Sequence, residues 1–281
     1  MNKVNLGLVA ASLLVLVLLS GNGFQEAGEK PLQPDDNQGI SLYYIANAGV
    51  LIKAGAKQVL IDGLHQPYRP AYRSTPPALK NDIYAGKEPF NSIDLVLVSH
   101  IHRDHFDPAD VAGLLKAQPE ALLFSSQQVI DSIQVQGVAP NSQLQSIVYQ
   151  DGNYVTTTRK DITVRAGKVA HGSARFRWIQ NLGHIVDVDG FRFLHVGDPG
   201  FGREDIDQLV ANTRIDVALL PGWFLSEPGG RAVIDEIIKP KHLAFLHVSP
   251  GDEQHLRQLA EIHYPGARVL SEPLEEITYE K

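Results

Sequence analysis

The sequence predicts a mixed α+β / α/β fold: a four-layer αββα sandwich made of two similar halves, with one site between them. Two observations favour this fold. A pattern of strands occurs twice along the chain, and polar side chains stand directly after several apolar strands. The chain has 281 residues, of which 43% are hydrophobic and 20% charged. This is the composition of an ordinary globular protein with a sizeable core.

The repeated unit begins with a hairpin. Residues 47–62 read as two apolar strands joined by a glycine turn, and residues 181–198 repeat the pattern. Short apolar runs bounded by Gly, Asn and Asp are typical of strands joined by turns. In both hairpins the second strand ends in an aspartate, Asp62 in the first and Asp198 in the second.

A second pair of segments follows the two hairpins. The apolar run 93–98 is echoed by 215–220, and each run leads through a loop into a helical stretch. One helix is expected over about 108–116, because Asp107 suits the N-cap and a proline stands at the first helical position. The other is expected over about 231–238. Two related halves in one sandwich account for these echoes better than two independent domains.

The N-terminal segment has the layout of a secretory signal peptide. A short basic start precedes an uncharged apolar stretch, and small residues follow. The stretch is short for a membrane span, which needs about 20 residues. We expect 1–23 to be a signal peptide, 24–39 a flexible lead-in and 40–281 a single domain. The protein is then exported, to the periplasm or the medium. The alternative is an N-terminal membrane anchor.

The composition of the chain limits which kinds of partner the protein is expected to bind. The net charge is −7 and no Lys/Arg-rich run is present, so nucleic acid is not expected, because phosphate binding needs a concentrated basic face. We expect a small-molecule substrate. The chain has no cysteine, which excludes disulfides, thiolate nucleophiles and cysteine zinc sites. Asn22 stands where a bacterial lipoprotein carries its lipidated cysteine, so no stable lipid anchor is expected.

The candidate site begins with three histidines and one aspartate in six residues, directly after the apolar run 93–98: His100, His102, Asp104 and His105. Neutral imidazoles and carboxylates are the ligand types of a catalytic zinc site. His100 and His102 point to the same side of extended backbone, whereas Asp104 and His105 follow a turn. One loop therefore offers two pairs of ligands, which favours two metals in one site.

Three further polar residues stand singly at predicted strand ends: His171, Asp198 and His247. A site gathered from distant segments is built in this way, and we expect all three to be ligands. His184 is expected inside a strand. His242, His255 and His263 are expected on the surface or on helices, and His195 is expected to support the ligands from behind.

Two residues are candidates for substrate contact. His65 lies in the long irregular loop 63–91, which follows Asp62 directly, and loops of this length are usually functional or disordered. Trp223 occupies the place in the second half that the histidine motif occupies in the first. Trp223 and Phe224 are expected either to form an apolar wall of the cleft or to belong to the core.

The order H-x-H-x-D-H, then a His, a Gly-Asp and a His, resembles the metallo-β-lactamase superfamily. The resemblance covers the chain from about Ile40 onward and implies the metallo-β-lactamase αββα fold, with Asp62 below the site and supporting it. The flanks of the motif look most like the branch of ascorbate-phosphate lactonase and nearby phosphodiesterases. They lack the Gly-Gly that usually follows the motif in true β-lactamases and glyoxalase II.

Carried over residue by residue, the resemblance implies two divalent ions. It assigns the first metal to His100, His102 and His171. It assigns the second metal to Asp104, His105 and His247, with Asp198 as a bridge between the two. Zinc is the default for such ligands, with manganese or iron as alternatives. A hydroxide that bridges the metals would be the nucleophile, and Asp104 would orient it as a catalytic residue.

These observations predict an exported binuclear metal-dependent hydrolase that attacks an ester, a lactone or a phosphodiester. One alternative is a cysteine-free-subclass metallo-β-lactamase that hydrolyses β-lactams, which export and the all-histidine first set favour. The other is a metal-binding protein with little catalysis, such as a sensor or a scaffold.

Overall fold

The computed structural model describes residues 39–69, 72–137, 141–148 and 154–281. The chain divides into two units, Met1–Asp35 and Asp36–Lys281, and every described residue belongs to the second. The expected signal peptide and nearly all of the expected lead-in lie outside the described residues. Among the helices of the described part, none is both long enough and apolar enough to cross a membrane.

Seven strands form the first sheet, in the order β14-β1-β2-β3-β4-β5-β6. The pairs from β14 to β3 are antiparallel, and the pairs from β3 to β6 are parallel. The strands are β1 Ile40–Ala46, β2 Gly49–Ala54, β3 Lys57–Ile61, β4 Leu95–Val98, β5 Leu122–Ser126, β6 Leu144–Ile147 and β14 Glu276–Tyr279.

The second sheet has the order β13-β12-β11-β10-β9-β8-β7. Its pairs from β7 to β10 are antiparallel, and those from β10 to β13 are parallel. The strands are β7 Tyr154–Arg159, β8 Ile162–Lys168, β9 Leu182–Val188, β10 Phe191–His195, β11 Val217–Pro221, β12 His242–Leu246 and β13 Arg268–Val269.

The two sheets repeat one another strand by strand. β1 to β6 and β8 to β13 show the same succession of antiparallel and then parallel pairings, and β14 and β7 each add one antiparallel edge strand. The predicted hairpins are β2–β3 and β9–β10, and the predicted strand pair is β4 and β11. The predicted sandwich of two similar halves is therefore confirmed.

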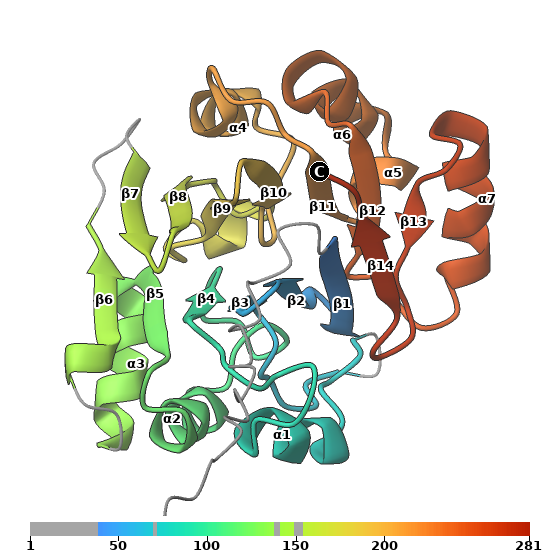
Figure 1. The fold of residues 1–281 in the computed structure, drawn as a ribbon. Coiled ribbons are helices and arrows are strands. Elements are labelled where there is room, and N and C mark those ends of the chain that lie inside the picture. Colours follow the sequence, from blue (N-terminus) through green and yellow to red (C-terminus); the bar gives the residue numbers. More distant parts are fainter. Residues whose placement is uncertain (1–38, 70–71, 138–140, 149–153) are drawn as a thin grey trace, which may run out of the picture. The chain divides into compact units, whose positions relative to one another are not determined.

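Helices cover the outer face of each sheet, which completes four layers (Figure 1). On the first sheet lie α1 Pro77–Tyr84, α2 Pro108–Ala117 and α3 Gln127–Gln136. On the second lie α4 Arg203–Val210, α5 Trp223–Ser226, α6 Pro228–Val233, the π-helical turn η3 Ile234–Ile238 and α7 Glu253–His263. Two short 3-10 turns are η1 Asn141–Gln143 and η2 Ala174–Phe176.

Both predicted helices are present. Asp107 caps α2, since its carboxylate accepts hydrogen bonds from the amides of Ala109 and Asp110, and Pro108 is the first helical residue. The helix expected over 231–238 starts three residues earlier, at Pro228, and becomes π-helical from Ile234. Pro228 at the first helical position is the signal that sets this earlier start.

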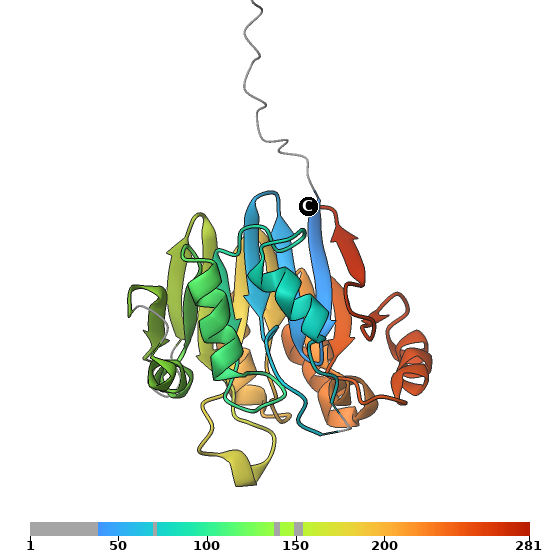
Figure 2. The ribbon, with the colours of Figure 1, turned by 90° about the horizontal axis from the view of Figure 1, so that it is seen from below.

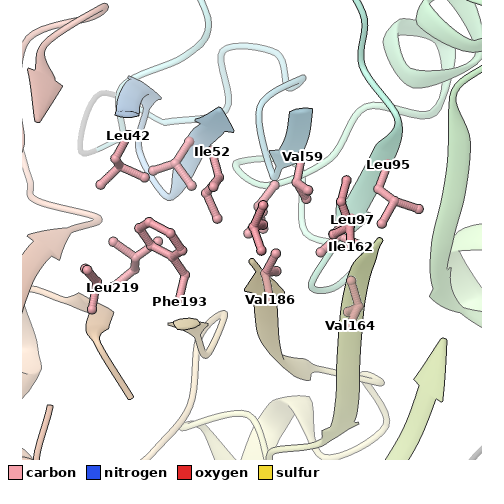
Figure 3. Close-up of a cluster of buried hydrophobic side chains, with 14 of the residues drawn as sticks. Leu42, Ile52, Val59, Leu95, Leu97, Ile162, Val164, Val186, Phe193 and Leu219 are labelled. Carbon is pink, nitrogen blue, oxygen red and sulfur yellow. The ribbon is translucent and has the colours of Figure 1, made fainter. Parts of the chain in front are cut away.

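The main core lies between the sheets. Leu42, Ile52 and Leu97 of the first sheet face Val186 and Phe193 of the second, and all are buried (Figure 3). A separate apolar cluster packs each helical layer onto its sheet. Burial of apolar area contributes about 25 cal/mol per Å², so this middle layer joins the two halves into one folded unit.

The carboxyl ends of β3, β4, β8, β10 and β12 lie on one side of the sandwich. These strands share one direction within their sheets, so the loops that follow them gather at a common edge. Polar residues that come after these strands are thereby brought together, as ligand sites are in open α/β sheets. The segment that carries η2, after β8, projects beyond this edge (Figure 2).

Candidate metal centre

The loop between β4 and α2 supplies four of the seven candidate ligands. The amides of His105 and Phe106 donate to the carbonyl of His102, at 3.0 and 2.9 Å, and close a tight turn. This turn separates the first pair of side chains from the second. His100 and His105 are completely buried and Asp104 is nearly so, whereas His102 is half-buried. The expected division of the loop into two pairs is present.

The other three candidates follow strands of the second sheet. His171 comes after β8 and forms an isolated bridge with Pro199, the residue after Asp198. The amide of Gly172 donates to the carbonyl of Asp198 at 3.0 Å, so these two loops are joined. His247 comes directly after β12 in left-handed backbone, with φ 55°. All seven predicted residues are brought into one place.

The first set of ligand-type atoms comprises His100, His102, His171 and Asp198. His102 Nδ1 lies 3.0 Å from His100 Nε2 and 3.3 Å from His171 Nε2. Asp198 Oδ2 lies 3.9 Å from His100 Nε2 and 4.0 Å from His171 Nε2. Three imidazole nitrogens therefore converge beside one carboxylate oxygen.

The second set comprises Asp104, His105, Asp198 and His247. Asp198 Oδ1 lies 3.0 Å from His105 Nε2 and 3.4 Å from His247 Nε2. Asp104 Oδ2 lies 3.3 Å from His247 Nε2 and 3.9 Å from His105 Nε2. The two oxygens of Asp198 thus face different sets.

These distances fit bound metal ions. Ligand atoms around a tetrahedral ion with bonds of about 2.0–2.1 Å lie about 3.3 Å apart. In addition, His105 Nε2, His247 Nε2 and Asp198 Oδ1 are buried without a hydrogen bond among the described residues. Buried polar atoms left in this way are costly. A cation between them would satisfy all three, so the residues present suit the group that the family resemblance implies.

Asp62 supports the centre from below, as the resemblance implies. Its carboxylate accepts hydrogen bonds from the Ser99 amide at 2.7 Å and the Ser99 hydroxyl at 2.5 Å. It also lies 2.8 Å from His105 Nδ1, which makes Nδ1 the protonated nitrogen and turns Nε2 toward Asp198. A partner of this kind fixes the tautomer and the orientation of a ligand ring.

In the second set, the neighbouring carboxylates raise the pKa of both imidazoles. Burial alone lowers the pKa of His247, but Asp198 and Asp104 outweigh it and raise that pKa to about 9. Burial alone would also lower the pKa of His105. The carboxylates of Asp198 and Asp62 outweigh this effect, so the pKa of His105 lies well above its usual value. Metal binding at these two rings would therefore release protons.

The three imidazoles of the first set are neutral. Burial lowers the pKa of His100 well below its usual value, and His105 lowers it further. Burial and the neighbouring His171 lower the pKa of His102 to about 4. Neutral imidazoles are the form that binds a metal. The imidazoles of the two sets thus differ in the direction in which their pKa is shifted.

The remaining histidines lie largely where the sequence places them. His184 is a buried residue of β9, and His255 and His263 are exposed on α7. His242 is exposed at the start of β12. His195 is buried and supports the loop of Asp198: its Nε2 donates to the Ala48 carbonyl at 3.0 Å, and its Nδ1 accepts from the Gly197 amide at 3.3 Å.

The two substrate candidates differ in exposure. Trp223 is partly exposed, and its ring meets the ring of His247 edge-on at 5.0 Å between centroids. Its neighbour Phe224 is a buried core residue. His65 is completely buried, with Nε2 3.4 Å from the Ala46 carbonyl. It faces the turn between β1 and β2, so its burial argues against the expected contact with substrate.

Three residues beside the centre did not stand out in the sequence. Phe176 packs its ring against His102 and His171, with centroids 4.6 and 5.1 Å apart. Tyr72 meets His247 edge-on at 5.2 Å. Asn47 contacts Asp104 and His247. The signal for Asn47 was its place at the start of the repeated hairpin, and the signal for Tyr72 was its place in the long loop 63–91. The sequence carries no such signal for Phe176.

A comparison with family models agrees with this geometry. A model described as the beta-lactamase superfamily domain matches residues 57–267. A protein of Polynucleobacter asymbioticus named UPF0173 metal-dependent hydrolase is 26% identical over 254 residues, which cover 84% of this chain and 83% of that protein. The matched region includes all seven candidate ligands.

Solved structures show the same fold. Igni18, a metallo hydrolase from Ignicoccus hospitalis, superposes with a TM-score of 0.61 at 20% identity, over 87% of this chain and all of that one. An isothiocyanate hydrolase from Delia radicum gut bacteria gives 0.62 at 16% identity, over 86% and 100%. The family model matches most of the chain, and the two repeated sheets and the order of the histidine and aspartate residues agree with it. The chain therefore belongs to the beta-lactamase superfamily.

Proposed function

We propose that this metal-dependent hydrolase of the beta-lactamase superfamily works with two divalent ions. The first set, His100, His102 and His171, would hold one ion, and the second set, Asp104, His105 and His247, would hold the other. Asp198 would bridge them. The observation that carries this proposal is the division of the Asp198 carboxylate, whose Oδ2 faces the first set and whose Oδ1 faces the second.

Bound divalent ions lower the pKa of a water molecule toward neutrality and polarise the oxygen of the bond under attack. The chain's own part is to fix the ligands and to balance the charge. Two carboxylates, Asp104 and Asp198, supply negative charge, and Asp62 holds His105 in one orientation. Asp104 would also accept a hydrogen bond from the attacking water. Zinc suits this ligand set best, and manganese and iron share it.

The substrate we propose is a small molecule with an ester, lactone or phosphodiester bond. A cavity of about 260 Å³ is lined by one residue of the second set, His247, by Trp223, and by apolar and polar residues that include Leu256 and Asp252. Trp223 would form its apolar wall. The net charge of −7 supports a small substrate over a nucleic acid, because phosphate backbones require a basic surface.

Metal content and a substrate screen test this function together. Protein purified without chelator and loaded with zinc should contain two ions per chain by elemental analysis. It should hydrolyse bis-p-nitrophenyl phosphate, a p-nitrophenyl ester or a homoserine lactone, and lose this activity with a chelator. Turnover of nitrocefin alone would favour a β-lactamase. Two ions without hydrolysis of any of these compounds would favour a metal-binding protein with little catalysis.

Export is a separate part of the proposal and is supported only by the layout of residues 1–23. The mature protein should begin near residue 24 and occur in the periplasm or the medium. N-terminal sequencing of protein from the producing cell measures this directly. A chain that begins at Met1 and stays in the membrane fraction would indicate an anchor.

A further inference from the structure

The turn between β1 and β2 lies at the same edge of the first sheet as the ligand loop that follows β4, because β1 runs in the same direction as β3 and β4. Its residues Asn47 and Ala48 are buried, although turns usually lie at the surface. Asn47 has left-handed backbone, with φ 50°. Asparagine adopts this conformation more readily than most residues. A buried polar residue in a special conformation calls for a specific role.

Asn47 makes contact with two residues of the second set. Its backbone carbonyl accepts a hydrogen bond from the amide of His247 at 2.8 Å. Its side-chain Nδ2 donates to the carbonyl of Asp104 at 2.9 Å and lies 3.4 Å from Asp104 Oδ2. These two residues come from loops 143 positions apart in the sequence, so a single side chain and its carbonyl join them.

The orientation of the amide follows from its surroundings. The Oδ1 atom of Asn47 is buried without a hydrogen bond among the described residues. If the amide were turned over, Oδ1 would face two oxygens of Asp104, and the hydrogen bonds that Nδ2 donates to Asp104 would be lost. The side chain is therefore retained for its donor, although its acceptor is left unsatisfied. That cost, of the kind a buried polar atom carries, indicates that the contact with Asp104 matters.

We propose that Asn47 is a positioning residue that holds Asp104 and His247 in place and thereby sets the affinity of the second metal set. This inference rests on the binuclear function proposed above. The amide donates chiefly to the backbone carbonyl of Asp104 and only at 3.4 Å to its carboxylate, so it fixes the loop that carries the carboxylate and leaves the negative charge available to an ion. The first set has no contact with Asn47 in any hydrogen bond of the described residues.

Asn181 occupies the same place in the second hairpin and makes a different contact. Its Oδ1 accepts from the amide of Asp198 at 3.1 Å, and its Nδ2 donates to the carbonyls of Val169 and Val196. It therefore holds the ligand that both sets share. The repeated asparagine thus supports one set in the first half and both sets in the second.

The test is a zinc titration of the apo protein by calorimetry, with unfolding midpoints measured in parallel. Asn47→Gly keeps the left-handed turn and the carbonyl that His247 uses, but removes the amide. We expect the first ion to bind as in the wild type and the second about 10- to 100-fold more weakly, the range for lost supporting contacts. Asn212→Gly is the matched control, since Asn212 also has left-handed backbone, with φ 58°, and is exposed away from the centre.

Single-set backgrounds assign the loss. In a His102→Ala chain the remaining ion occupies the second set, and addition of Asn47→Gly should weaken it. In a His247→Ala chain the remaining ion occupies the first set, and the same substitution should leave its affinity unchanged. Asn47→Ala provides a second variant: it strains the turn where glycine loosens it, so an effect common to both belongs to the amide.

If Asn47→Gly binds each of the two ions as tightly as the wild type does, the role of Asn47 is overturned and the binuclear function stays intact. If Asn47→Gly weakens zinc binding equally in the His102→Ala and His247→Ala chains, the role of Asn47 is also overturned, because the effect is then not confined to the second set. A wild-type chain that binds only one ion would instead overturn the binuclear function.

Discussion

At the scale of single residues, the centre depends on charge more than on packing. Two carboxylates and five imidazoles lie within a few ångströms, and the two oxygens of Asp198 serve different sets. Charged groups in buried surroundings interact strongly, so one substitution changes the whole cluster. Predictions at this scale therefore concern single polar atoms.

Asp198→Asn removes the charge that both sets share while it keeps the size and one oxygen of the side chain. We expect the second ion to bind more weakly and hydrolysis to fall by orders of magnitude, since the ions supply most of the rate. Folding should persist, because Asp198 lies at a strand end outside the apolar core. Elemental analysis, circular dichroism and a hydrolysis assay measure the three effects. His263→Ala on the exposed face of α7 is the control; full metal and activity in Asp198→Asn would refute the bridge.

His184 links stability to pH. It is buried in β9, and burial, with a smaller effect of His195, lowers its pKa to about 3 from a usual value of 6.5. The folded state thus disfavours the charged ring of His184. The folded state therefore has its full stability, as far as His184 is concerned, above pH 6.5, and loses stability as the pH falls toward about 3. The loss is at most about 1.4 kcal/mol per pH unit.

His184→Leu should remove this dependence. The free energy of unfolding of the variant minus that of the wild type should rise by about 2 kcal/mol between pH 7 and pH 5, because only the wild type loses the contribution of His184. Urea unfolding at both pH values measures the difference, and His263→Leu serves as the exposed control. A difference between variant and wild type that does not change with pH would contradict the assignment.

At the scale of elements, strand ends and helix starts place the ligands. The turn from His100 to His105 joins β4 to α2, and the cap of α2 fixes where that turn stops. Asp107 follows the motif by two residues but points to helix amides. The element thus separates a residue that anchors the loop from the residues that face the centre.

Asp107→Ala should lower the free energy of unfolding by about 1 kcal/mol, the usual value of an N-cap side chain. Zinc stoichiometry should stay at two, since the hydrogen bonds of Asp107 join it to helix amides and to Leu64, and to no described residue of either set. Chemical unfolding and elemental analysis test both statements. Asp207→Ala, an exposed change on α4, is the control, and a loss of metal in Asp107→Ala would mean that the cap also shapes the centre.

At the scale of the folded unit, the ligands tie the two sheets together. The motif comes from the first sheet, and His171, Asp198 and His247 come from the second. Bound ions would therefore add to the apolar layer between the sheets (Figure 3). Any ligand that binds only the folded state stabilises it.

Zinc should raise the unfolding midpoint of the wild-type protein, and a chelator should reverse the increase. At a free zinc concentration 1,000-fold above the dissociation constant, the gain is about 4 kcal/mol per site. Differential scanning calorimetry of apo and loaded protein measures it. Apo and loaded proteins that unfold at the same temperature would show that the ions do not join the halves.

The sequence determined much of this protein by itself. The repeated hairpins predicted two similar halves, and the spacing from His100 to His105 predicted two pairs of ligand-type side chains, because local periodicity and turn signals act within a few residues. The exact start of the helix at Pro228 was missed by three residues, since boundaries depend on contacts as well as local preference.

Only the tertiary structure decided how distant residues meet. The buried place of His65, the aromatic contacts of Tyr72 and Phe176, and the link from Asn47 to Asp104 and His247 all arise where separate loops converge. A single sequence carries strong signals for strands and ligand types. It carries little for contacts between loops, because these join residues that lie far apart in the sequence and depend on how the elements that carry the loops pack together.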